Sequence, residues 1–298
     1  MIVLAATPLI VGVLAGLLGG RLGQRLQPRH AVPLLTALAL TVALCTAIAL
    51  SGLAVLALAQ LGPMPRLGHW SAPALRADAG EPVALGLIAL GALVLTLGAA
   101  CARALTSIYA LARAARQARR LVPVAGNLVL VDDAEPVAYA VAGRIVMSRS
   151  LLVALPTDER RAVLAHEAAH LRHRHHLYLH LTALSAAASP LLRPLVGAIA
   201  VGIERWADED AAGAVRSREV AARGLARAAL AQGRAPGLAV ADSAVAERVR
   251  ALLEPTPVHR LPAALALAAG LACWLAAAAV TWRTEELIQI AERALLRR

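Results

Sequence analysis

The chain has 298 residues, of which 59% are hydrophobic and only 16% are charged. This composition excludes an ordinary soluble globular protein, in which about a quarter of the residues are charged. The formal net charge is +11, and every basic residue is an arginine. Because these arginines flank apolar runs, they indicate the orientation of a membrane protein and argue against direct nucleic-acid binding. The abundance of alanine and arginine indicates a GC-rich bacterial genome.

Four stretches are long and apolar enough to cross a lipid bilayer, which takes about twenty residues of helix. They are residues 2–20, 33–60, 83–111 and 261–282. We therefore expect a mainly α-helical integral membrane protein with an α+β domain inserted between its third and fourth transmembrane helices. The expected units are a three-helix transmembrane region over 1–111, the inserted domain over 112–260, the fourth helix over 261–282 and a short C-terminal tail over 283–298.

The distribution of arginines predicts which side of the membrane each connection faces. Three arginines and no acidic residue lie between the first two spans, and four arginines follow the third span, whereas 61–82 carries two arginines and two acids. The N-terminus and 61–82 are therefore expected outside a bacterial plasma membrane, and 112–260 in the cytoplasm. The tail over 283–298 conflicts with this orientation, because it should lie outside but carries four arginines.

Residues 177–203 form a fifth apolar stretch, which we expect not to cross the membrane. Pro190, Arg193 and Pro194 lie at its centre, where proline breaks a helix and arginine is costly in hydrocarbon. The piece on either side spans only about 20 Å as helix, too short for about 30 Å of hydrocarbon. We expect an interfacial helical hairpin, and a single kinked span is the alternative.

Residues 166–170 read HEAAH, an HExxH motif. Positions i and i+4 of a helix share a face, so the imidazoles of His166 and His170 can bind one zinc ion. Glu167 is placed beside the metal to take a proton from a water molecule that the metal activates. The helix is predicted to start at Thr157, its expected N-cap, which is followed by two acidic residues.

A catalytic zinc ion needs a third protein ligand, and Glu204 is the candidate. Asp208 lies one helical turn later on the same face, where it can hydrogen-bond a ligand imidazole and fix its tautomer. Without the upstream motif these acids would be interpreted as a solvated acidic face. The 33 residues between His170 and Glu204 are too few for two crossings, which need about forty. The three ligands can therefore meet only if 171–203 begins and ends on one side of the membrane.

Four further histidines lie within ten residues after the motif: His173, His175, His176 and His180. Of these, His173 and less closely His180 continue the helix face of the zinc ligands. A second metal site is one interpretation of the cluster, but we favour an interfacial basic stretch whose polar tips reach lipid headgroups. His173 is also a candidate auxiliary residue that polarises a substrate carbonyl.

Residues 128–131, 138–141 and 144–147 are predicted to form short β-strands, because they are apolar or β-branched and are separated by turn residues. An exposed strand beside a zinc-binding helix can bind an extended peptide as a further strand. A sheet that only supports the helix is the alternative. The candidate substrate-edge residues are Val137, Ala138, Tyr139 and Ala140.

The HEAAH motif and a later E-x-x-x-D, with three apolar spans before them and one after, resemble the BlaR/MecR-type integral-membrane metallopeptidases. They are similar, more distantly, to the HtpX/Ste24-type membrane proteases, which share the gluzincin core. The resemblance implies a cytoplasmic gluzincin-like zinc protease domain in which His166, His170 and Glu204 bind Zn²⁺. It also implies that Glu167 is the general base and that Asp208 supports a ligand imidazole. We expect a short member of this group, without an extracellular sensor domain.

We therefore expect a zinc metalloendopeptidase that hydrolyses peptide bonds with metal-activated water, in regulatory or membrane-protein proteolysis. Its substrates would be proteins or peptides, and the resemblance adds a transcriptional repressor as a candidate substrate. The alternative is a catalytically inactive membrane signal transducer or scaffold that retains the protease core. A metal transporter is disfavoured, because transporters place ionisable residues inside their spans, and these spans are nearly free of them.

Overall fold

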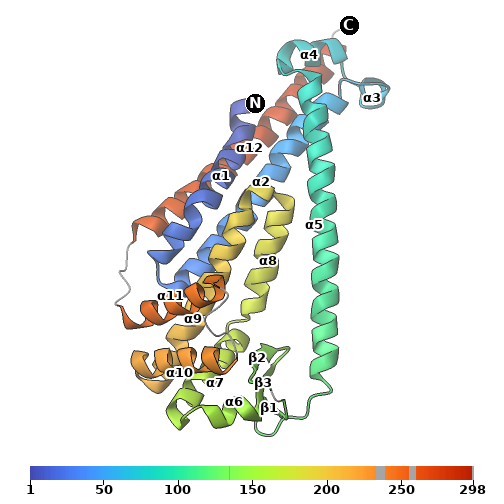
Figure 1. Cartoon of the computed structure of the whole chain (residues 1–298). Helices are drawn as coiled ribbons and strands as arrows, with labels where there is room; N and C mark the ends of the chain where they lie inside the picture. The colour runs from blue at the N-terminus through green and yellow to red at the C-terminus, as the bar shows by residue number, and fades with distance from the viewer. Residues whose placement is uncertain (134, 233–238, 255–259, 297–298) are drawn as a thin grey trace.

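The computed structural model describes residues 1–133, 135–232, 239–254 and 260–296, and it is mostly helical (Figure 1). Four helices within the described residues are long and apolar enough to cross a membrane. They are α1 (Ile2–Gln24), α2 (Pro28–Leu58), α5 (Val83–Ala118) and α12 (Leu261–Leu296). Three of them contain a whole predicted span, and α2 ends at Leu58, two residues before the end of the span predicted at 33–60. The helices α1, α2 and α12 pack on one another, whereas α5 packs on α2 and leaves most of its surface exposed.

Helix α12 is longer than the span predicted at 261–282. It continues through Leu296, so the described part of the expected tail is helical, and residues 297–298 lie outside the described part. The extension is amphipathic and buries Leu287 and Ala291 against Leu56 and Leu75. The short helices α3 (Met64–Leu67) and α4 (Ala72–Ala79) lie at the same end of the molecule as both chain termini (Figure 1).

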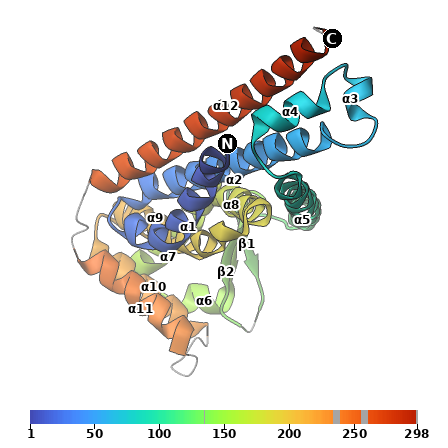
Figure 2. The same ribbon diagram turned by 90° about the horizontal axis from the view of Figure 1, so that it is seen from above.

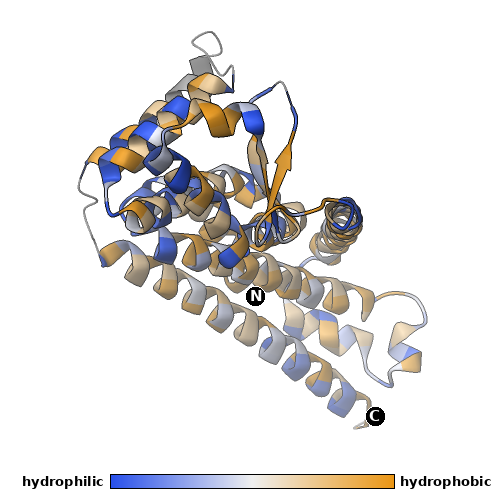
Figure 3. Cartoon of the chain, turned by 90° about the horizontal axis from the view of Figure 1, so that it is seen from below, coloured by the Kyte–Doolittle hydropathy of each residue, from blue (hydrophilic) through white to orange (hydrophobic). Residues whose placement is uncertain are grey.

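The inserted domain lies at the opposite end of the helical bundle (Figures 1 and 2). It contains α6 (Arg149–Ala154), α7 (Thr157–Arg172), α10 (Arg218–Ala231) and α11 (Ala239–Leu253) beside a small sheet. Hydrophilic residues are more frequent on these helices than along α2 and α12 (Figure 3).

The sheet contains three strands in the order β1-β3-β2, and its strands confirm the sequence prediction. They are β1 (Leu128–Val131), β2 (Ala138–Val141) and β3 (Arg144–Ser148), so only β3 is longer than expected, by one residue. β1 pairs with β3 in parallel and β2 pairs with β3 antiparallel. Ala142 and Gly143 form the two-residue turn between β2 and β3, both with positive φ, as such tight hairpins require. Among the described residues, the outer edge of β2 has no partner strand.

The fifth apolar stretch forms the predicted hairpin, from α8 (His175–Ala188) through a short 3-10 turn (η1, Pro190–Leu192) to α9 (Arg193–Val215). It packs among α1, α2 and α5. Its tip packs beside the middle of α1, where Leu191 lies against Gly12 and Gly16. Leu195 and Ile199 fill the contact and are fully buried. The hairpin starts and ends at the domain end of the bundle.

The contact between Gly16 and the hairpin tip predicts a stability loss. A Cβ atom at Gly16 would lie 2.4 Å from the backbone oxygen of Leu191, which cannot move without shifting the hairpin. Such overpacking costs about 1–3 kcal/mol. We expect Gly16→Ala to lower the midpoint of thermal unfolding in detergent. Gly20→Ala is the matched control on the same helix, since a Cβ there meets Ala198 at an ordinary 3.7 Å; equal midpoints for the two variants would contradict the tight contact.

Candidate metal centre

Helix α7 carries the HExxH motif. Pro156 is its N-cap, and Asp158 and Glu159 lie in the first turn, where the helix dipole favours negative charge. Thr157, expected as the N-cap, is instead the first helical residue, because the chain has already turned from extended backbone at the preceding proline. The buried carboxylate of Glu159 contacts Arg227 of α10 at 3.1 Å and ties the helix to the rest of the domain.

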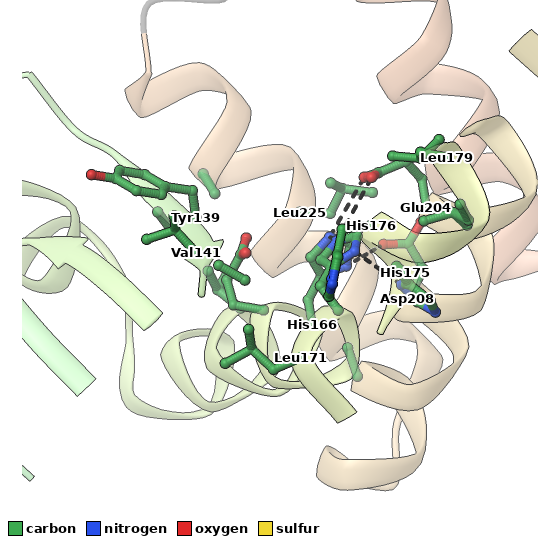
Figure 4. A pocket seen from close by; sticks show the side chains of 18 of the residues that line it. Tyr139, Val141, His166, Leu171, His175, His176, Leu179, Glu204, Asp208 and Leu225 are labelled. Atoms are coloured by element: carbon green, nitrogen blue, oxygen red, sulfur yellow. Dashed lines mark hydrogen bonds and ion pairs between the residues drawn. The ribbon is translucent and has the colours of Figure 1, made fainter. Parts of the chain in front are cut away.

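The three predicted metal ligands converge from two helices. Figure 4 shows two of them, His166 and Glu204, at the same cavity. The Nε2 atoms of His166 and His170 are 3.2 Å apart. Each faces the carboxylate of Glu204 on α9: His166 Nε2 lies 3.6 Å from Oε2, and His170 Nε2 lies 3.6 Å from Oε1. The hairpin thus returns the chain to the same side, as the sequence argument required for a shared ion.

These distances fit a metal ion. In a tetrahedral zinc site the bonds are about 2.0–2.1 Å long, which places the ligand atoms about 3.3 Å from one another. The observed separations of 3.2 Å and 3.6 Å match this geometry. Two imidazoles and one carboxylate are also a donor set that catalytic zinc uses. His166, His170 and Glu204 therefore present one face of a coordination site, with the fourth direction left to the cavity.

The outward nitrogens of both histidines are held by hydrogen-bond partners. Nδ1 of His166 lies 3.0 Å from Oδ1 of Asp208, as expected from its position one turn after Glu204. Nδ1 of His170 lies 2.9 Å from Nδ1 of His175, a contact that the helical spacing did not predict. Because Nδ1 is engaged in each ring, Nε2 is the nitrogen available to a metal.

Arg248 on α11 is a site residue that the sequence analysis missed. It binds both oxygens of Asp208 at 2.8 Å and 2.7 Å, and its Nη1 lies 3.0 Å from Oε2 of Glu204. The side chain of Asp208 is only 5% exposed, so this paired contact compensates a buried charge. No motif or fixed spacing links Arg248 to the HExxH helix, and one arginine among many carries no signal of its own.

The carboxylates of the site remain ionised. Burial alone would raise the pKa of Glu204, but the hydrogen bond to His166 and the charge of Arg248 lower it to about 2. Burial also disfavours ionised Asp208, yet hydrogen bonds from Arg248 and His166 lower the pKa of this group as well. Both groups therefore carry negative charge at neutral pH, as ligands and supports of a cation should.

The two ligand histidines differ in charge. Burial disfavours protonation of His166, but its hydrogen bonds to Asp208 and Glu204 outweigh burial and raise its pKa to about 9. Burial, followed by repulsion from His166, lowers the pKa of His170 to about 4. Without a metal, the His166 ring is therefore protonated on both nitrogens. A divalent cation bound by Nε2 would replace the proton on that nitrogen.

Glu167 faces the cavity beside the ligands and next to strand β2. Burial raises the pKa of its carboxyl group, although the charge of His166 and a hydrogen bond from the backbone of Ala140 oppose the shift. A raised pKa makes the Glu167 carboxylate a stronger base than an ordinary glutamate, which suits it to take a proton in hydrolysis.

Only two of the four predicted edge residues offer their backbone to the cavity. The N–H of Ser148 on β3 donates to the carbonyl of Val137, so the alternation of an antiparallel pair directs the polar groups of Val137 and Tyr139 toward β3. Ala138 and Ala140 therefore direct their N–H and C=O groups toward the free edge, where the N–H of Ala140 donates to the carboxylate of Glu167. Figure 4 shows Tyr139 and Val141 on the strand at one side of the cavity, with Glu204 and Asp208 on α9 at the other.

The structure corrects the interpretation of two of the extra histidines. His173 does not line the cavity; its Nε2 lies 2.7 Å from Oδ2 of Asp210, and its ring stacks on Trp206, so it is not placed to polarise a substrate. His175 is only 1% exposed and cannot reach lipid headgroups. Burial, then repulsion from His170, lowers the pKa of His175 to about 3, which keeps the ring neutral.

The ligands and Glu167 line a cavity of about 900 Å³. Its other walls come from the domain end of α5, the first turns of α8, the β2 edge and α10. Representative apolar wall residues are Leu111, Leu177, Leu179 and Leu225. The cavity therefore joins the candidate metal site to the region where α5 and α8 leave the bundle.

The sequence model of peptidase family M48 matches residues 106–256, just over half of the chain. The chain belongs to peptidase family M48. The match contains α7, the hairpin and Arg248, and it begins at the domain end of α5. Peptidases of this family depend on a metal, and the His-His-Glu group of this M48 peptidase is a metal site of the right composition. Comparison of this M48 peptidase with curated proteins and with solved structures gives no match.

Proposed function

We propose that the protein is a membrane-embedded zinc-dependent endopeptidase in which His166, His170 and Glu204 bind Zn²⁺. The observation that carries the proposal is the convergence of the two histidine Nε2 atoms and the Glu204 carboxylate at 3.2–3.6 Å from one another. The carboxylate of Glu167, which is not one of these ligands, lines the same cavity. A zinc ion held there lowers the pKa of a water molecule to about 7 and polarises a carbonyl oxygen.

Each remaining residue has a role in this reaction. Glu167 removes the proton from the attacking water and returns it to the leaving amine, and its raised pKa suits both steps. Asp208 holds the ring of His166 through Nδ1, and Arg248 holds Asp208. The N–H and C=O of Ala138 and the C=O of Ala140 would hydrogen-bond the substrate backbone as an added strand, which would keep the scissile bond extended beside Glu167.

The walls of the cavity favour substrates that lie at a membrane surface. Leu111 of α5 and Leu177 and Leu179 of α8 are apolar, and they belong to helices that continue into the bundle. An extended segment that leaves the bilayer next to α5 would meet these leucines as it enters the cavity. We therefore propose membrane proteins or membrane-attached regulators as substrates; a transcriptional repressor, suggested by the BlaR/MecR-type resemblance, is the narrower candidate.

We also propose that the inserted domain faces the cytoplasm of a bacterial plasma membrane and that the N-terminus lies outside. Arg21 and Arg25 at the end of α1 and Arg113 and Arg116 at the end of α5 lie at the domain end of the bundle, and the positive-inside rule assigns that end to the cytoplasm.

Reconstitution tests the proposed function. The purified protein in liposomes is incubated with a reporter peptide tethered to the bilayer by a transmembrane helix. We expect cleavage within the extended segment next to the membrane, loss of cleavage after extraction of the metal with a chelator, and recovery when zinc alone is returned. Metal-bound protein that cleaves neither tethered nor free peptides would instead support the non-catalytic scaffold.

A further inference from the structure

His175 is the least expected member of the site. It is the first residue of α8, and Arg174 before it adopts a left-handed conformation, with φ of 51°. This reversal folds the start of α8 back against the end of α7. As a result the His175 ring, 1% exposed, lies beside His170 although helical periodicity alone places His173 nearer to that face.

The contact between the two rings determines where their hydrogens lie. The Nδ1 atoms of His170 and His175 are 2.9 Å apart, so one of them must donate a hydrogen and the other accept it. His170 directs Nε2 toward His166 and Glu204 and needs a free lone pair there to bind a metal. Its hydrogen therefore lies on Nδ1, and His175 accepts it through an unprotonated Nδ1.

We propose that His175 is a positioning residue that selects the metal-binding tautomer of His170 and fixes the orientation of its ring. The inference rests on the proposed metal site and deepens it. Asp208 does the same for His166 with a negatively charged acceptor, whereas His175 uses a neutral one. The two ligand histidines are thus oriented by different chemistry, and the acceptor for His170 adds no further negative charge to a site that already contains three carboxylates.

The surroundings of His175 make the ring rigid. The Trp206 ring lies against the His175 ring, with centroids 5.0 Å apart. The His173 ring stacks on the His175 ring, with centroids 5.6 Å apart. Its Nε2 is buried and has no hydrogen-bond partner among the residues that the structure describes. The bond to His170 is therefore the one polar contact of this ring within those residues, and a buried polar group whose bond is removed costs more free energy than an exposed one.

Matched substitutions separate the acceptor from the bulk of the ring. Asparagine at 175 places its side-chain oxygen close to the position of Nδ1, whereas leucine has a similar shape without an acceptor. The dissociation constant for zinc is measured by competition with a chelating dye, and the visible spectrum of the Co²⁺ form reports the ligand geometry. We expect His175→Leu to weaken zinc binding about 10–100-fold and to change the Co²⁺ spectrum, and His175→Asn to retain both.

Two comparisons guard the interpretation. His180→Leu removes another histidine of α8 that does not line the cavity, and we expect it to bind zinc like the wild type. His175→Phe keeps a ring without an acceptor and replaces the leucine variant should that variant not fold. Wild-type affinity in the acceptor-free variants, or equal weakening by asparagine and leucine, would overturn the role of His175. A wild-type protein that binds no zinc would overturn the metal site itself.

Discussion

Replacement of Glu167 by glutamine is expected to lower kcat for peptide cleavage by about 10²–10⁴-fold, the usual contribution of a general base. The amide has the shape of the carboxylate but cannot take the proton of the attacking water. Because Glu167 is not one of the three converging ligands, the variant should still bind one metal ion per chain. The measurement is steady-state hydrolysis of the tethered reporter together with elemental analysis of the purified protein.

Asp158→Asn is the control for this experiment, since it removes an exposed carboxylate from the same helix. It should leave kcat and metal content unchanged. If Glu167→Gln cleaves the reporter at the wild-type rate, another group transfers the proton and the assigned role is wrong. If the variant also loses its metal, Glu167 contributes to binding and not only to proton transfer.

Arg248→Met is expected to produce the largest loss of stability among single substitutions at the site. Asp208 is 5% exposed and would keep a buried charge after both of its hydrogen bonds to the guanidinium are lost. Removing one partner of a buried ion pair costs about 3–5 kcal/mol. The free energy of unfolding of the metal-free protein, measured in mixed detergent micelles, should fall by up to this amount, because protonated His166 stays 3.0 Å from Asp208 and compensates part of its charge.

A second substitution distinguishes this charge effect from simple loss of packing. In the double variant Arg248→Met with Asp208→Asn no uncompensated charge is left, so the loss should be clearly smaller than the sum of the two single losses. Arg250→Met, an exposed arginine two residues later on α11, should change stability by no more than about 0.5 kcal/mol. Additive losses would show that the ion pair contributes nothing beyond its volume.

The parts of the site that the sequence predicts are those encoded by local spacing. His166, Glu167 and His170 follow from one helical turn, and Glu204 with Asp208 follows from another. The approach of these two helices was also predictable from the sequence. The length of 171–203 and its central prolines favour a hairpin that brings the chain back to the side on which it started. The strands were predictable for a similar reason, since each is a short apolar run that ends at a turn residue.

The residues that escaped prediction depend on tertiary packing. Arg248 reaches Asp208 only because α11 packs on α9, and nothing in the intervening sequence specifies that contact. His175 reaches His170 because a non-glycine residue adopts a left-handed conformation, which composition does not signal. The end of α12 was misjudged because hydropathy falls at Arg283, although Leu287 and Ala291 still share a buried helical stripe.

Helix α9 connects the bundle directly to the metal site. It starts beside the hairpin tip, which packs on Gly16, and the same continuous helix carries Glu204. From Arg193, the first residue of α9, to Glu204 the axial length is about 16 Å at 1.5 Å per residue, so a tilt of about 3° at the tip moves the carboxylate by about 0.9 Å. Metal–ligand distances tolerate only about 0.2 Å. A substitution that disturbs the packing of the hairpin tip in the apolar bundle is therefore expected to weaken metal binding even when it leaves the inserted domain folded.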